Sequence, residues 1–145
     1  MSKDKKHHHK HGSLRVSWDG TVIAGVDRVS PLVRSVEVIT VREGSSPAGA
    51  GHMVPGHIGS EPVTLERPAG GDTAFEQWAG SAESIAVKKD VTVEILDREG
   101  GVVLAYRIHR CWPTEYRVAL LEPGSRAPAV EQLRLENDGW ERVTL

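Results

Sequence analysis

The sequence predicts a mainly β protein: two packed antiparallel sheets (a sandwich or barrel), one flanking α-helix and one long inter-strand loop. Three observations support this prediction. Runs of β-branched and apolar residues of strand length recur along the chain. Gly-containing turns separate several of these runs, and one segment stands out with helical spacing. With 145 residues and no visible internal repeat, the chain fits a single domain, which we place at residues 13–145.

The first strands lie on either side of Asp19-Gly20. "LRVSW" and "TVIAGVDRV" flank this dipeptide, which is a strong short-range signal for a hairpin. "SVEVITVR" and "EPVTLERP" are the next runs of strand length. Residues 44–60 between them are rich in glycine, nearly uncharged and interrupted by Pro47 and Pro55. Structureless loops beyond about 12–15 residues are uncommon in compact domains unless they are functional or disordered, so we expect a functional loop here.

One segment, "GGDTAFEQWAGSAES", has the pattern of a helix. Asp72 or Thr73 is the expected N-cap and Gly80 the expected C-cap. Phe75 and Trp78 are three residues apart, so both face the same side of the helix. We expect these two aromatic rings to pack on a sheet.

The second half of the chain returns to strands. "VTVEILD" and "VVLAYRIHRCW" are joined by a Gly-containing turn at residues 98–101, and "TEYRVALLE" follows Pro113, which we expect to end the preceding strand. "AVEQLRLENDGWERV" fits a strand–turn–strand ending at least as well as a helix. Together with the helix, strand alternation predicts these core residues: Phe75, Trp78, Val93, Ile95, Leu104, Tyr106, Ile108, Val118 and Leu120. The opposite strand faces carry Glu94, Arg107, His109, Glu115 and Arg117.

No catalytic, cofactor-binding or metal-binding motif is recognisable. His52 and His57 are five residues apart on a glycine-rich segment, which lacks the fixed face of a persuasive metal site. His109 and Cys111 would point to the same side of a strand, but free cysteine is most often a buried apolar residue. No strand–GxxxxGK[ST]–helix motif is present to hold a phosphate. We therefore predict no enzyme activity, no cofactor and no metal.

Composition limits the location and the partners. The net charge is −2, which gives no sign of a nucleic-acid binder. No stretch approaches the roughly 18 apolar residues of a membrane span, and the beginning of the chain lacks the apolar segment of a signal peptide. The single cysteine fits a reducing compartment. We therefore expect the protein in the cytoplasm.

The first residues differ from the rest. "MSKDKKHHHKHG", residues 1–12, is rich in lysine and histidine and has nothing apolar to bury, so we expect a disordered arm. Clustered imidazoles are good metal ligands and lysines favour anionic surfaces, but such tracts are compositional evidence only. A solubilising arm is the simpler interpretation.

The order of these segments resembles the tail tube proteins of contractile phages. "VIAGVDRVSPL", "VREG", the glycine-rich excursion, "VPGHIGSEPVTLER", "FEQWA", "VTVEILDREGGVVLAYRIHRCWPTEY" and "AVEQLRLENDGWERV" follow one another from about residue 14 to residue 143. The chain looks most similar to the inner-tube proteins of phage-tail-like contractile injection systems. It departs from the family in its Lys/His arm and at Leu65-Glu66-Arg67-Pro68, where family members normally read Leu-Lys-Arg-Gly.

The resemblance implies a structural role. Such proteins form hexameric rings that stack into a hollow tube inside a contractile sheath, on a baseplate and spike, with protein cargo in the lumen. Their long loop reaches neighbouring subunits and rings. In this chain the corresponding contact residues are Glu43, Gly44, Pro47, Gly49, Gly51, His52, Met53, Pro55, Gly56 and His57. The five charged and polar residues opposite the predicted core (Glu94, Arg107, His109, Glu115 and Arg117) would face the lumen.

Other interpretations stay open on sequence alone. A tube-initiating adaptor and a secreted hexameric ring of the haemolysin-coregulated type share the fold. A monomeric β-sandwich that binds a ligand through His52, His57 and the acidic sheet face belongs to a different class, as does a hydrolase that uses Cys111. The ligand-binding module would need a concave site, and the hydrolase would need a reactive thiol.

Overall fold

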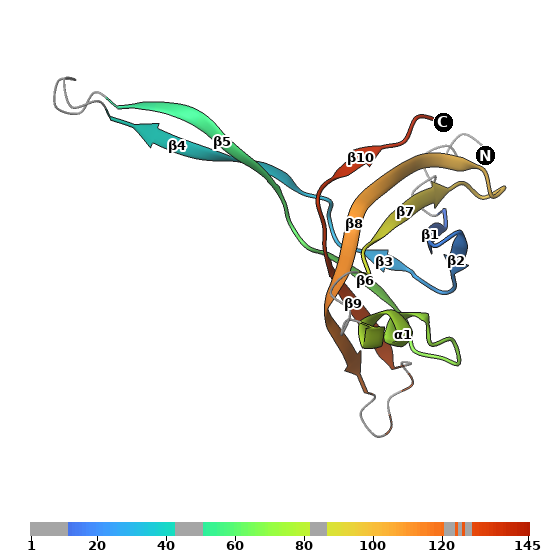
Figure 1. Cartoon of the computed structure of the whole chain (residues 1–145). Coiled ribbons are helices and arrows are strands. Elements are labelled where there is room, and N and C mark those ends of the chain that lie inside the picture. Colours follow the sequence, from blue (N-terminus) through green and yellow to red (C-terminus); the bar gives the residue numbers. More distant parts are fainter. Residues whose placement is uncertain (1–11, 43–50, 82–86, 121–123, 125, 127–128) are drawn as a thin grey trace.

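The computed structural model describes residues 12–42, 51–81, 87–120, 124, 126 and 129–145 (Figure 1). The strands in chain order are β1 (Leu14–Trp18), β2 (Thr21–Ile23), β3 (Arg28–Val29), β4 (Arg34–Val41), β5 (His52–Ser60), β6 (Val63–Pro68), β7 (Lys89–Leu96), β8 (Val102–Ala119), β9 (Val130–Glu136) and β10 (Trp140–Arg142). The helix α1 (Ala74–Gly80) lies between β6 and β7. Within these ranges no helix has the length and apolarity to cross a membrane.

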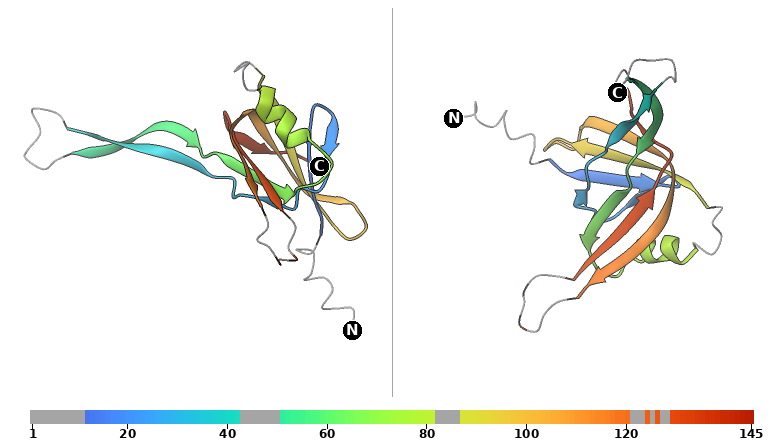
Figure 2. Two further views of the ribbon diagram at one scale, coloured as in Figure 1. Left: turned by 90° about the horizontal axis from the view of Figure 1, so that it is seen from below. Right: turned by 90° about the vertical axis from the view of Figure 1, so that its left-hand side faces the viewer.

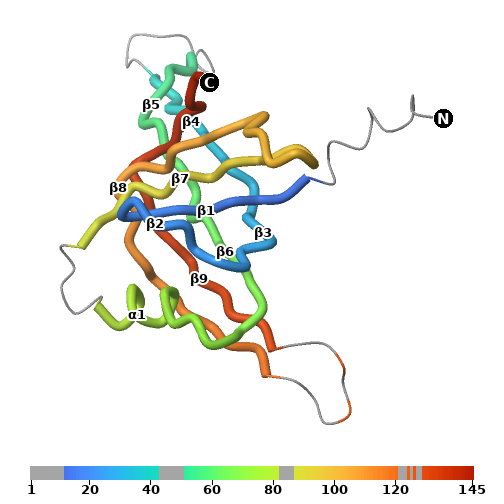
Figure 3. Tube along the Cα trace, turned by 90° about the vertical axis from the view of Figure 1, so that its right-hand side faces the viewer, coloured from blue at the N-terminus to red at the C-terminus, as the bar shows by residue number. Residues whose placement is uncertain are grey.

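Strand β8 organises the sheet. Its first half pairs with β7 and β10, and its second half pairs with β9, all antiparallel. The strand order among the described residues is therefore β2-β1-β7-β8-β9-β6-β3, and β10 adds to β8 off this path. The sheet curls around α1 and around its own interior (Figure 3). The mainly β fold with antiparallel sheets and one short helix is confirmed.

The core lies between the two halves of this sheet. Val16 and Val91 come from the β1–β7 half, and Leu65 and Leu133 from the β6–β9 half. Phe75 of α1 is fully buried, and Trp78 lies against Trp18 with ring centroids 4.7 Å apart. The predicted packing of the helix on the sheet is confirmed, and so is the burial of Val93 and Ile108.

The predicted turns form as expected. Asp19 and Gly20 both adopt positive φ angles, 54° and 72°, as a type I′ hairpin turn requires. The Asp97 side chain accepts hydrogen bonds from the backbone of Glu99 and Gly101 in the β7–β8 turn. The chain ends in a strand–turn–strand, β9 to β10, as predicted. At the helix, Thr73 is the N-cap and Ser81, one residue after the predicted Gly80, is the C-cap.

Strand β8 corrects two predictions about its second half. Pro113 does not end a strand: β8 runs through it, and the register with β9 shifts between Pro113 and Glu115. Pairing with β7 has already ended at Cys111, so the missing N–H of Pro113 breaks no ladder on that side. The strand then projects beyond the core, and for this reason Val118 is 41% and Leu120 80% exposed, although both were predicted to be buried.

A second bulge lies at Arg110, whose φ is 49°. In this bulge Val91 pairs with Ile108 and Lys89 with Cys111, so two residues of β8 oppose one residue of β7. The bulge turns Cys111 to the same buried side as Ile108, away from His109. The expected His109–Cys111 face is therefore wrong, because strand alternation stops at the bulge.

A buried arginine ties four parts of the chain together. Arg67 of β6 donates hydrogen bonds to Glu131 of β9 at 3.2 Å, to the carbonyl of Ala24 at 2.9 Å and to the carbonyl of Asp72 at 3.0 Å. Its guanidinium also lies 4.3 Å from the centroid of the Phe75 ring. Arg67 and Glu131 are both buried, and Arg67 also pairs with the Asp72 carboxylate at 3.2 Å, so the buried charge of Glu131 depends on Arg67 for neutralisation.

The same network extends to β8. The Tyr116 hydroxyl donates a hydrogen bond to Glu131 at 3.0 Å. The pKa of Tyr116 is raised, mainly by burial and secondly by this hydrogen bond. The backbone N–H of Ala74 holds the pKa of Asp72 below its usual value. Strand alternation places Arg67 on the same buried face as Val63 and Leu65, but only the structure shows which partners neutralise its charge.

Replacing Arg67 by methionine should lower the free energy of unfolding by about 3–5 kcal/mol, because Glu131 would remain buried without its counter-charge. Arg117→Met is the matched control: Arg117 is exposed and pairs with Glu115 on the surface, so its loss should cost less than about 1 kcal/mol. Urea titration of the monomeric protein measures both. Equal losses would show that the Arg67 cluster is not a stabilising element.

Candidate assembly site

The most unusual element is a two-stranded ribbon that leaves the body of the domain (Figures 1 and 2). It consists of β4 and β5, residues 34–41 and 52–60, which pair with each other antiparallel and form a separate two-stranded sheet. At about 3.3 Å per residue the strands extend roughly 25 Å. An isolated hairpin of this kind is marginally stable in water, so the ribbon needs a partner surface.

The ribbon corrects the expectation of a structureless loop. Residues 52–60 form β5, so the predicted contact residues His52, Met53, Pro55, Gly56 and His57 lie on a strand. Pro55 is tolerated because each ribbon strand has one unpaired edge. Gly51 lies just before β5. Glu43, Gly44, Pro47 and Gly49 lie outside the described residues.

Apolar side chains gather on one face of the ribbon, which we call the apolar ribbon face: Val36, Val38, Met53, Pro55 and Ile58. The pairings Val36–Ile58, Val38–Pro55 and Thr40–Met53 place these residues side by side. Strand alternation from Met53 and Pro55 alone would put Ile58 on the opposite face of the ribbon. A register shift opposite Glu37 brings it to the apolar ribbon face instead. Val36, Val38, Met53 and Ile58 are 48, 65, 75 and 70% exposed.

The other face of the ribbon has a close contact at Gly56. Gly56 lies beneath Glu37 and Ile39, so closely that a Cβ at this position would lie 2.7 Å from the Ile39 side chain. On this face Val41 and Val54 are half-buried and Ile39 is 40% exposed. The large side chains of the apolar ribbon face are more exposed than these in the described part of the chain.

The base of the ribbon is fastened to the β9–β10 turn, in an arrangement we call the root clamp. The Trp140 indole N–H donates to the carbonyl of Val33 at 3.3 Å, and the Asn137 side chain donates to the carbonyl of Glu61 at 3.0 Å. The Arg34 guanidinium lies 4.3 Å from the centroid of the Trp140 ring and donates to the Trp140 carbonyl. These contacts fix the direction in which the ribbon leaves the domain.

The residues predicted to face a lumen fall into two groups. Glu94, Arg107 and His109 lie on the outer face of the β1–β7–β8 half, where Glu94 pairs with Arg15 at 2.8 Å. The His109 ring lies between carboxylates, with Nδ1 4.0 Å from Asp90 and Nε2 3.5 Å from Glu141. Glu115 and Arg117 lie beyond the bulges, on the β9-paired half of β8, and pair with each other at 3.3 Å. Both groups are polar and of mixed charge.

Two arrangements that could support catalysis or ligand binding are unfavourable. Burial raises the pKa of the Cys111 thiol to about 12, so this thiol is protonated near neutral pH, the opposite of a reactive nucleophile. His52 and His57 lie on the ribbon, and no cluster of three or more metal-ligating side chains occurs among the described residues.

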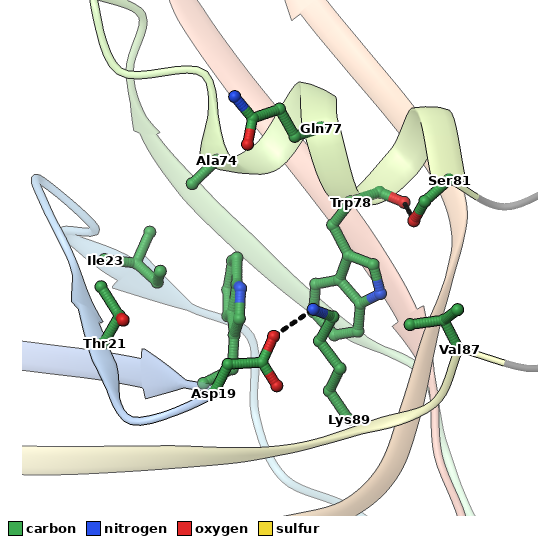
Figure 4. Close-up of a pocket in the computed structure, with 10 residues that line it drawn as sticks. Asp19, Thr21, Ile23, Ala74, Gln77, Trp78, Ser81, Val87 and Lys89 are labelled. Carbon is green, nitrogen blue, oxygen red and sulfur yellow. Dashed lines mark hydrogen bonds and ion pairs between the residues drawn. The ribbon is translucent and has the colours of Figure 1, made fainter.

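The helix side of the domain has a cavity of about 430 Å³ (Figure 4). Trp78 and Ile23 provide apolar walls, and Lys89 pairs with Asp19 at its edge. The Lys89 ammonium also lies 5.6 Å from the centroid of the Trp78 ring. The Lys89 side chain is thus held at the edge of the cavity by an acidic group and an aromatic face.

The described residues thus combine a curled β body with a projecting ribbon that has an exposed apolar face. The model of the T4-like virus tail tube protein gp19 family matches residues 13–141, so the chain belongs to this tail tube family. No curated protein matches the sequence.

Solved structures share the fold. A chain of the PVC sheath–tube complex, from an extracellular contractile injection system in the extended state, has a TM-score of 0.79 at 24% identity over 92% of this chain and 89% of that chain. A chain of the tube-terminating cap of the anti-feeding prophage has a TM-score of 0.77 at 21% identity, with 91% and 88% covered. Hcp1 from Flavobacterium johnsoniae has a TM-score of 0.57 at 13% identity, with 90% and 94% covered.

Replacing Trp140 by alanine should loosen the ribbon without unfolding the domain. The change removes a hydrogen bond and a cation–π contact, together about 1–2 kcal/mol, so local opening at the root should become roughly 5–30-fold more frequent. Hydrogen exchange at Arg34 and Glu61 measures this opening. Trp140→Phe, which keeps an aromatic face for Arg34, should give a smaller increase. Unchanged exchange in both variants would show that the root clamp does not hold the ribbon.

Proposed function

We propose that the chain is the inner-tube subunit of a phage-tail-like contractile injection system. Six copies form a ring, and rings stack into a hollow tube inside a contractile sheath. The observation that carries this proposal is the ribbon, an extended element with an exposed apolar face that the described part of its own chain does not cover. Membership of the tail tube family supports it, and so does the similarity to chains of the PVC sheath–tube complex and of the anti-feeding prophage cap.

The partners follow from the assembly. The chain contacts other copies of itself, the sheath around the tube, and the baseplate and spike at its end. Contacts between different patches of identical chains close into rings or continue as open stacks, according to the rotation between copies. Assembly would take place in the cytoplasm of the producing bacterium, and the role is structural, without catalysis.

The lumen wall is the third part of the proposal. A passage for protein cargo must avoid large apolar patches that would hold the passenger. The outer face that carries Glu94, Arg107 and His109 has this character, since its charges alternate in sign and several are paired. The Glu115–Arg117 pair forms a similar polar surface on the other half of β8.

Shortening the ribbon tests the proposal. Replacing residues 36–58 by Asn-Gly joins the paired residues Ser35 and Gly59 through a two-residue turn and leaves every core residue in place. We expect a folded monomer that forms neither rings nor rods, whereas the full chain forms both. Circular dichroism monitors folding, and negative-stain microscopy with sedimentation monitors assembly. Rods of normal width from the shortened chain would contradict the proposal.

A further inference from the structure

The body of the domain has an apolar groove whose lining residues are only partly covered. A cavity of about 410 Å³, which we call the core groove, opens between the β1–β7–β8 half of the sheet and the segment around β3. Its apolar lining consists of Leu14, Val29, Leu32, Val93, Ile95 and Tyr106. Strand alternation predicts a closed core around Ile95 and Tyr106, yet both are only half-buried. The groove is a part of the core that the described residues do not cover.

The ribbon and the groove of one chain do not meet. The groove reaches Leu32, immediately before the root of the ribbon, but the root clamp directs the ribbon away from the body (Figure 1). Along their length β4 and β5 mainly contact each other. Each copy therefore has one exposed apolar ribbon face and one open apolar groove, and the contacts described do not unite them within the chain.

We propose that the apolar ribbon face of one copy packs into the core groove of a second copy. This inference rests on the proposed function and adds to it the surface that receives the ribbon. Val38, Met53 and Ile58 would provide the apolar side chains that Ile95 and Tyr106 lack. Asp27 and Arg28 also line the groove, beside its apolar residues.

This contact is head-to-tail. One chain gives its ribbon to a neighbour and receives the ribbon of another, so the contact repeats without a two-fold axis. Face-to-face packing of two ribbons would cover both apolar ribbon faces but would leave both core grooves open. Ribbon-into-groove packing covers both kinds of surface and is therefore the arrangement that buries more apolar area.

Photo-crosslinking identifies the contact directly. A photoreactive phenylalanine analogue replaces Met53 in isotope-labelled protein, which is mixed with unlabelled full-length protein, assembled and irradiated. We expect the probe to attach to unlabelled chains at residues 14, 27–32 or 93–106. Attachment within 36–58, or elsewhere on the neighbour, overturns the groove as the docking site while the assembly itself stands. If no assembly forms at any concentration, the proposed function fails, and this inference fails with it.

Two complementary variants give a second test. Val38→Asp with Met53→Asp disables the ribbon but keeps the groove, and Leu32→Glu disables the groove but keeps the ribbon. For each variant alone, the assembled fraction should be at least tenfold lower than that of the unmodified chain. Their mixture should form two-copy complexes, because one intact ribbon meets one intact groove. A mixture that stays monomeric, or normal assembly by Leu32→Glu alone, overturns the inference.

The matched control charges the opposite face of the ribbon. Ser35 pairs with Gly59 and His52 with Val41, so both lie on the face opposite the apolar ribbon face. Ser35→Asp with His52→Asp introduces the same two charges as the ribbon variant and should assemble normally. Equal loss in this control would overturn the assignment of the docking face to Val38 and Met53.

Discussion

An extended two-stranded ribbon that projects from a domain has no second layer of its own chain against it, so its side chains cannot bury both of its faces. Here Gly56 allows Ile39 to lie across the inner face, while Val36, Val38, Met53 and Ile58 remain in solvent on the other. Burying these side chains would contribute about 1–2 kcal/mol each, because each already has some contact within the ribbon. Exposure of the ribbon therefore lowers the stability of a single chain, whereas its burial would stabilise an assembly. For such a contact to form, the rest of the domain must hold the ribbon at a defined angle.

Two polar clusters hold the ribbon in this way, one buried in the body of the domain and one nearer the surface at the root of the ribbon. Arg67 and Glu131 join β6 to β9 and hold the loop before α1 and the β2–β3 connection in place. Trp140 and Arg34 connect this rigid sheet to the root of the ribbon. A buried ion pair adds little net stability compared with an apolar pair, but it is intolerant of misplacement and so defines one arrangement. Rigidity of the body and direction of the ribbon are thus linked through the short strands β9 and β10.

Much of this fold could be predicted from the sequence because local signals are strong. Asp19-Gly20, the turn at residues 98–101 and the spacing of Phe75 and Trp78 each specify their own structure within a few residues. The ribbon was mistaken for a loop because glycine and proline suggest irregular backbone, whereas strands with open edges tolerate both. The bulge at Arg110 could not be predicted, since it depends on pairing with β7. Partners such as Glu131 for Arg67 and Arg34 for Trp140 are 64 and 106 residues distant, so only the folded chain brings them together.

If the ribbon becomes covered on assembly, its amides should exchange at different rates in separated subunits and in assembled tubes of the same unmodified chain. We expect hydrogen exchange of the β4 and β5 amides to be rapid in the subunit and at least tenfold slower in the tube, with little change in the Leu65–Leu133 core. Equal exchange in the two states would mean that the ribbon is as exposed in the assembly as in the single chain, and assembly would then not be what covers it.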